Sequence, residues 1–256
     1  MHHQADWPDK DWLAAGSLLI RISGWQIRIA TEKERGMKAL LCSALVLLPL
    51  TVACSPTNQQ NVDVPSFTTL DVSRGLNVTL VCGNGYRVET SARQDVLEKL
   101  VIRPQGQSLV IENHASDDSI LRDHDATVRI TVSAPITVVK AQAGVTMSIP
   151  ACAVSPDAFA VNGSMGTAVN VAGTTRRLDL SLAMGASFNA HEKASHEKAF
   201  SAQEAVVNIA MGVDARLCHV RQLSGTITTG ARVRVAPDTR VQTNNGIAGL
   251  VEHDGC

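Results

Sequence analysis

The chain has 256 residues, enough for one large domain or two small ones. Hydrophobic residues make up 45% and charged residues 18% of it, a composition that indicates a folded protein and excludes a disordered one. The 23 basic and 24 acidic residues give a net charge of −1, so the composition offers no reason to expect a nucleic-acid partner.

An uncharged apolar run, ALLCSALVLLPLTVA, occupies residues 39–53. It is shorter than the roughly 20 apolar residues that a membrane-spanning helix needs, and it fits the core of a secretory signal better. Met37 and Lys38 precede it directly and can supply the start methionine and the basic residue of a signal peptide. The run ends in TVAC, which resembles the lipobox of bacterial lipoproteins except that Thr51 replaces the usual Leu. We therefore predict that residues 37–53 are a lipoprotein signal peptide and that Cys54 is the lipidated residue.

Ordinary secretion and a retained anchor are the alternatives to lipidation. Residues 1–36, which contain all three tryptophans of the chain, are interpreted as a miscalled upstream extension; a cytoplasmic extension before an uncleaved anchor is the alternative. Ser55 follows Cys54 instead of the Asp that commonly holds lipoproteins at the inner membrane, and this resemblance favours the outer membrane. Residues 54–65 are polar and contain two prolines, so they are predicted to be a tether to a domain at 66–256.

Four cysteines follow Cys54, namely Cys82, Cys152, Cys218 and Cys256. An exported protein meets oxidising conditions, so two disulfides can form, with three connectivities open. Buried free thiols are the alternative. No CxxC motif or Cys/His cluster occurs, so a zinc site is not expected.

Residues 67–132 are predicted to form successive strands. Alternating apolar residues such as Leu76, Val78 and Leu80 are typical of half-buried strands, and residues 82–85 contain a glycine turn. Residues 92–103 (ARQDVLEKLVIR) instead have the apolar spacing of a helix, which Pro104 would end.

From residue 138 onward the sequence repeats a pattern of strand, glycine turn and strand. The glycines are spaced by 22, 19, 27 and 18 residues, and the step of 27 contains HEKASHEKA, interpreted as an inserted loop. A second register aligns Asn170, Asn189 and Asn208 at steps of 19, so the boundaries of the repeats stay open. The glycines of the first register are Gly144, Gly166, Gly185, Gly212 and Gly230.

A period of about 20 residues with short strands and glycine turns is typical of a solenoid, in which stacking supplies the core. Only 3% of the chain is aromatic, so the core would consist of Val, Leu, Ile and Ala. We therefore predict an all-β fold, a β-helix with one short helix near its N-terminal part. A β-sandwich or jelly roll, with strands every 8 to 12 residues, is the alternative.

Residues 67–113 (FTTLDVSRGLNVTLVCGNGYRVETSARQDVLEKLVIRPQGQSLVIEN) carry a resemblance to a known family. Their order of strands, glycine turn, short helix beginning near Asp95 and final strand is similar to the putative auto-transporter adhesin family with a head GIN domain. The resemblance extends over roughly 64–252. It implies an exported bacterial protein, often a lipoprotein, with a right-handed parallel β-helix fold (a single-stranded solenoid). The resemblance implies no catalytic residues for this chain.

Two charged segments resemble metal sites without matching their spacing. The histidines of HEKASH (191–196) are five positions apart, whereas a zincin helix needs them four apart to face one metal. Asp117, Asp118, Asp123 and Asp125 match no EF-hand spacing, and the neighbouring His124 and Arg122 oppose a cation. Both segments are interpreted as solvated loops, and no metal or other cofactor is expected.

Catalysis and aromatic sugar binding have little support in the residues. Arg232 and Arg234 lie on one face of a strand, but no acidic partner is expected nearby, so no catalytic residue is assigned. Tyr86 is the one amphipathic ring after residue 54, so recognition of a sugar would have to use polar groups. The acidic residues 117–125 support the alternative of a carbohydrate-active β-helix enzyme, a lyase or a hydrolase.

The leading hypothesis is a lipid-anchored, non-enzymatic protein of the cell envelope that acts as an interaction, adhesion or structural surface module. It would contact the membrane through Cys54 and an unidentified envelope or surface partner, and no nucleic acid. Unpaired strand edges at the ends of a β-helix also favour a homo-oligomer.

Overall fold

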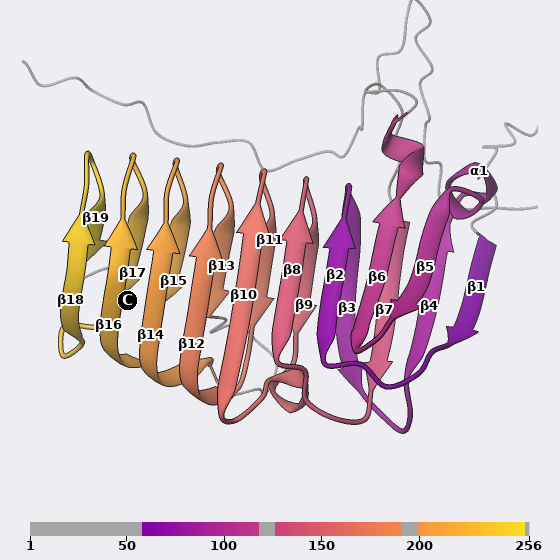
Figure 1. Ribbon diagram of the computed structural model, residues 1–256, viewed down its shortest axis with the longest axis horizontal. Helices are drawn as coiled ribbons and strands as arrows, with labels where there is room; N and C mark the ends of the chain where they lie inside the picture. The colour runs from indigo at the N-terminus through magenta and orange to yellow at the C-terminus, as the bar shows by residue number, and fades with distance from the viewer. Residues whose placement is uncertain (1–57, 118–125, 191–198, 254–255) are drawn as a thin grey trace, which may run out of the picture. The chain divides into compact units, whose positions relative to one another are not determined.

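The computed structural model describes residues 58–117, 126–190, 199–253 and 256 (Figure 1). The expected extension, signal peptide and lipidated Cys54 lie outside these residues. The described residues form nineteen β-strands, helix α1 (Gln94–Leu97) and two short 3-10 helices, η1 (His114–Asp117) and η2 (Ala151–Ala153). The predicted all-β class is confirmed. None of the helices in the described ranges has the length and apolar character needed to cross a membrane.

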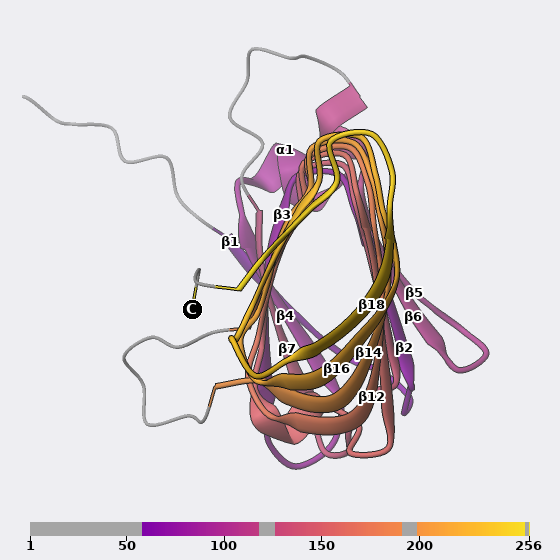
Figure 2. The same ribbon diagram turned by 90° about the vertical axis from the view of Figure 1, so that its left-hand side faces the viewer.

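The strands form two sheets, which face each other in Figure 2. The ten-stranded sheet has the order β1 (Asn58–Asp63), β4 (Arg87–Ala92), β7 (Ala126–Val132), β3 (Leu76–Cys82), β9 (Thr146–Ile149), β11 (Ala168–Val171), β13 (Ser187–Ala190), β15 (Asp214–Leu217), β17 (Arg232–Val235) and β19 (Leu250–Glu252). The nine-stranded sheet has the order β18 (Arg240–Asn245), β16 (Val220–Ile227), β14 (Ser201–Ile209), β12 (Thr174–Leu182), β10 (Ala158–Ser164), β8 (Val138–Gln142), β2 (Thr69–Ser73), β6 (Ser108–Asn113) and β5 (Leu100–Gln105).

From β8 to β19 the chain alternates between the two sheets. Each strand from β10 onward pairs in parallel with the strand two places earlier, so Val161 of β10 lies between Val139 of β8 and Leu180 of β12. All three side chains are buried between the sheets. The alternation of apolar and polar residues produces this arrangement, because every second side chain of a strand points to the same face.

The repeats pass from the nine-stranded to the ten-stranded sheet through stacked two-residue turns. Ala143, Met165, Met184, Met211 and Thr229 all have positive φ, as does the glycine that follows each of them. The amide of each glycine donates to the carbonyl of the turn in the next repeat, for example Gly166 N to Met184 O at 2.9 Å. The register given by the glycines is therefore correct. The second register holds only for Asn170 and Asn189, since Asn208 lies in the other sheet beside Ser181.

Two expected elements differ from those observed. Residues 92–103 are not one helix, because α1 ends at Leu97 and Leu100–Gln105 forms β5. Strand β5 is an edge strand that pairs antiparallel with β6, and an edge strand tolerates Pro104 although proline lacks an amide hydrogen. Within the expected tether, Asn58–Asp63 forms strand β1, which pairs antiparallel with β4. Its polar side chains are tolerated because most of them are exposed.

Candidate binding groove

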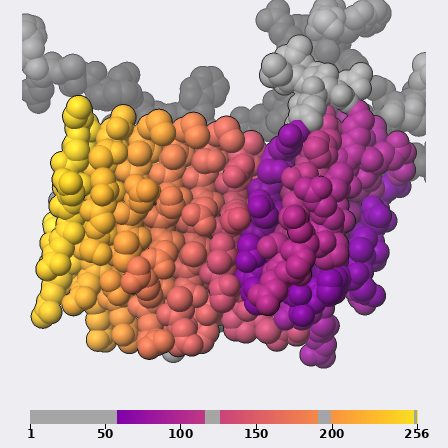
Figure 3. All heavy atoms as spheres, in the orientation of Figure 1, coloured from indigo at the N-terminus to yellow at the C-terminus, as the bar shows by residue number. Residues whose placement is uncertain are grey.

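A polar groove with a volume of about 1270 Å³ lies where the repeats pass from the ten-stranded to the nine-stranded sheet. Figure 3 shows the outer face of the nine-stranded sheet, on which successive repeats lie side by side. The groove follows the first residues of β10, β12, β14, β16 and β18. Its floor is one row of paired residues, Ala158, Arg177, Glu204, Gln222 and Arg240, that runs perpendicular to the strands. Four strand spacings of about 4.8 Å make this row about 19 Å long.

Ion pairs fix two of the arginines that line the N-terminal half of the groove. Arg176 lies 3.0 Å from Asp157, and Arg177 lies 2.9 Å from Asp179 and 3.9 Å from Glu204. The pKa of Arg177 is raised, first because its guanidinium donates a hydrogen bond to Asp179, and then because Asp179 and Glu204 attract its charge. These guanidinium groups are therefore largely neutralised by the protein itself.

The C-terminal half of the groove carries arginines of a different kind. Arg221 and Arg240 are both exposed, and among the described residues neither has an ion-pair partner. His219, Gln203 and Asp238 also line the groove. A guanidinium presents several hydrogen-bond donors in a planar fork that fits a carboxylate, and the amide and carboxylate side chains can accept from hydroxyl groups. The groove can thus hold a chain that carries both anionic groups and hydroxyls.

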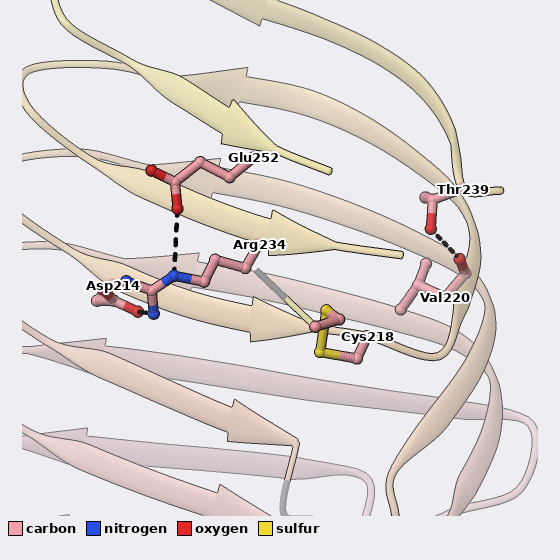
Figure 4. Close-up of a disulfide and its surroundings, with 7 residues drawn as sticks. Asp214, Cys218, Val220, Arg234, Thr239 and Glu252 are labelled. Carbon is pink, nitrogen blue, oxygen red and sulfur yellow. Dashed lines mark hydrogen bonds and ion pairs between the residues drawn. A yellow bond between two sulfur atoms is a disulfide. The ribbon is translucent and has the colours of Figure 1, made fainter. Parts of the chain in front are cut away.

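Disulfide Cys218–Cys256 forms part of the groove wall, with Cα atoms 5.5 Å apart (Figure 4). Cys218 directly follows β15, and the bond fixes Cys256 to that point. Nearby, the hydroxyl of Thr239 donates to the carbonyl of Val220 at 2.9 Å, which joins the turns that lead into β16 and β18. The C-terminal wall of the groove is therefore held by one covalent bond and one buried hydrogen bond.

Arg232 and Arg234 of β17 have acidic partners, and the expectation that none lies nearby is wrong. Arg234 lies 3.0 Å from Asp214 and 3.2 Å from Glu252, and Arg232 lies 3.1 Å from Glu252 (Figure 4). Parallel stacking brings these residues together, because β17 lies between β15 and β19. The repeat of 18 to 20 residues was the signal that could have revealed the pairs. They form an ion-pair cluster on the ten-stranded sheet, and none of its four residues lines the groove.

The other residues singled out in the sequence do not gather at one site. Cys82 and Cys152 form a second disulfide, with Cα atoms 6.1 Å apart. The ring of Tyr86 packs edge-on against Phe67, with centroids 5.4 Å apart, so it covers the core. Asp117 ends η1, while Asp118, Asp123, Asp125 and HEKASH lie outside the described residues. Within the described ranges, no three His, Cys, Asp or Glu side chains are grouped so that they could hold a metal ion.

The groove does not show in the sequence pattern. Arg177 and Glu204 are 27 positions apart, whereas Glu204, Gln222 and Arg240 follow one another at steps of 18. The step of 27 residues hides the row until the strands are paired.

The chain is similar to known proteins in its fold and in its family. The chain resembles the crystal structure of a putative adhesin from Bacteroides fragilis, with a TM-score of 0.54 and 9% identity over 77% of this chain and 96% of that one. It also matches the crystal structure of a putative adhesin from Parabacteroides merdae, with a TM-score of 0.47 and 15% identity over 77% and 95%. At such identities the likeness concerns the fold alone. The curated proteins include no match. The family described as "Putative auto-transporter adhesin, head GIN domain" matches residues 66–252, and the chain therefore belongs to this family.

Proposed function

We propose that this chain is an exported, lipid-anchored and non-enzymatic protein of the cell envelope that attaches to acidic polysaccharides through its groove. Membership of an adhesin-like family supports a cell-envelope location. Lipidation of Cys54 rests on the sequence pattern that resembles a lipobox, and placement in the outer membrane rests on Ser55 in the position after it.

The observation that carries the binding role is the pair of exposed arginines, Arg221 and Arg240, in the polar groove. Guanidinium groups bind carboxylates through two parallel hydrogen bonds. The side chains of Gln203, Gln222 and Asp238 supply acceptors for sugar hydroxyls. A carboxylated polysaccharide offers both kinds of group along one extended chain, and the row of about 19 Å spans several sugar units.

We further propose that the repeats wind as a right-handed parallel β-helix. The alternation of successive strands between the two sheets and their parallel pairing support this winding. Such a rigid unit would hold the residues of the groove in fixed positions relative to one another. The edge strands β18 and β19 each pair with one neighbour, so a homo-oligomer through these edges is part of the proposal. A strict monomer in light scattering at high protein concentration would contradict that part.

The binding role is tested with immobilised polygalacturonate, a carboxylated polysaccharide, and with dextran as an uncharged control surface. We expect saturable binding to polygalacturonate that weakens as salt rises, because salt screens exposed charges. The double variant R221Q/R240Q should lose most of this binding. The matched control is R216Q, because Arg216 is also exposed and has no ion-pair partner among the described residues but lies on β15 in the other sheet.

Equal loss in R216Q and in R221Q/R240Q would contradict the groove as the binding site, since it would indicate general charge attraction. Binding to dextran as strong as to polygalacturonate would contradict an acidic ligand. Release of shortened polysaccharide during the assay would contradict a non-enzymatic role and would favour a carbohydrate-active enzyme.

A further inference from the structure

Three methionines form an exposed ridge at the stacked turns between the two sheets. This methionine ridge consists of Met165, Met184 and Met211, whose exposed fractions are 46%, 46% and 47%. The amide of Gly166 donates to the Met184 carbonyl, and the amide of Gly185 donates to the Met211 carbonyl, both at 2.9 Å. The three methionines therefore occupy equivalent positions in neighbouring turns, about 4.8 Å apart from one to the next. These turns form the upper edge in Figure 1.

Backbone preference does not explain methionine at these positions. Met165, Met184 and Met211 have φ values of 56°, 54° and 60°, in the left-handed region that L-residues other than Asn and Asp seldom adopt. A two-residue turn with positive φ at both positions favours Asn-Gly or Asp-Gly. Methionine thus accepts backbone strain three times in succession. Strain of this kind is often retained where a side chain has a role in binding.

Burial does not explain the methionines either, because each residue is nearly half exposed to solvent. The turns on either side of the ridge carry Ala143 and Thr229 at the equivalent position, so the run of thioethers ends after three. What the three side chains share, and their neighbours lack, is a polarizable sulfur atom at the end of a flexible chain.

We propose that the methionine ridge binds a soft monovalent cation of the Cu(I) or Ag(I) class. Thioether sulfur is a neutral ligand that selects such ions, whereas hard cations prefer oxygen. Three rotatable bonds in each methionine let sulfur atoms from adjacent turns converge on one ion. The ion exchanges water for thioethers and keeps its charge, so no proton or electron is transferred. Met184, in the middle, takes part in every adjacent pair.

The direct test uses Ag(I), which has the same ligand preference and is not oxidised in air. The full chain is labelled with ¹³C at the methionine methyl groups, and its free thiols are blocked with N-ethylmaleimide because thiolates also bind Ag(I). We expect the methyl signals of Met165, Met184 and Met211 to shift together and to saturate. The signal of Met147 should stay in place, because that side chain is fully buried. Absence of saturable shifts for the three ridge signals would overturn the proposal.

Leucine variants test the role of the sulfur atoms, since leucine keeps the apolar character and nearly the same volume. M184L leaves two thioethers two strand spacings apart, and we expect Ag(I) affinity to fall by about tenfold or more. M211L leaves an adjacent pair and should weaken binding less. Equal affinity for the wild type and the triple variant M165L/M184L/M211L would overturn the proposal. If the triple variant does not fold, the methyl shifts of the wild type decide the question.

Discussion

The guanidinium of Arg234 lies 3.0 Å from the carboxylate of Asp214, although the two residues are 20 positions apart in the chain. Arg234 also lies 3.2 Å from Glu252, so one arginine joins residues of three successive strands of the ten-stranded sheet. Its side chain is only 20% exposed, and those of its partners are 44% and 26% exposed. This partial burial distinguishes the cluster from the exposed ion pairs elsewhere on the surface.

Replacing Arg234 should destabilise the C-terminal repeats. In R234Q the partly buried carboxylates of Asp214 and Glu252 lose a shared partner, so we expect the free energy of unfolding to fall by about 1–2 kcal/mol. Urea denaturation measures this change. R176Q is the control, because the Arg176–Asp157 pair is 68% and 76% exposed and its loss should cost less than about 0.5 kcal/mol. Equal effects of the two variants would contradict a special role for the cluster.

Asparagine in place of Met184 should stabilise the fold. Met184 has a φ of 54°, which Asn adopts at lower cost, so M184N should raise the free energy of unfolding by about 0.5–1 kcal/mol. M184V should lower it, because a β-branched residue is especially disfavoured at positive φ. Thermal unfolding of the two variants gives the signs. A stability loss in M184N would show that stacking of the methionines contributes more than the relief of backbone strain.

Removing disulfide Cys218–Cys256 should affect both stability and binding. The bond spans 38 positions, so the double variant C218A/C256A should lose up to about 4 kcal/mol of stability and, with it, the wall of the groove. The control is C82A/C152A, whose bond spans 70 positions and does not line the groove. It should lose stability and keep polygalacturonate binding. Peptide mapping without reduction checks the two pairings, and a Cys82–Cys256 or Cys82–Cys218 peptide would contradict them.

Gly225 of β16 should not tolerate even a methyl group. A Cβ atom there would lie 2.0 Å from the carbonyl oxygen of Val207, and the φ of +120° is unfavourable for any other residue. We expect G225A to cost about 3 kcal/mol or more. At Gly230 nothing lies within 4 Å of such an atom, so G230A should cost only about 1 kcal/mol through its φ of +71°. Chemical denaturation of both variants separates the steric clash from the effect of positive φ. Equal losses of stability in G225A and G230A would show that positive φ alone matters.

Local patterns in the sequence predicted much of the fold. The alternation of Leu76, Val78 and Leu80 identified β3, in which all three are buried. The glycine steps identified the stacked turns, because those turns need residues that accept positive φ. The region 92–103 was less well predicted, since its apolar spacing fits either a helix or a short helix followed by a strand. Residues 100–105 form strand β5 because they pair with β6, and this contact lies outside the local sequence pattern.

The candidate groove could not be predicted in the same way. Its row of residues exists only once β12, β14, β16 and β18 are in register. The insertion at HEKASHEKA lengthens one repeat, so the sequence spacing does not identify Arg177 and Glu204 as neighbours. The partners of Arg234 lie at regular steps of 18 and 20 residues, but they become neighbours only when β15, β17 and β19 are paired.

Attachment of this chain to the cell envelope through a lipid on Cys54 is tested most directly by the intact mass of the protein extracted from its native membranes. We expect a mass equal to residues 54–256 plus acyl chains on Cys54. A mass that includes residues 37–53, or one without acyl chains, would contradict the claim. Recovery of the protein only in the soluble fraction, and not in the membranes, would also contradict the claim.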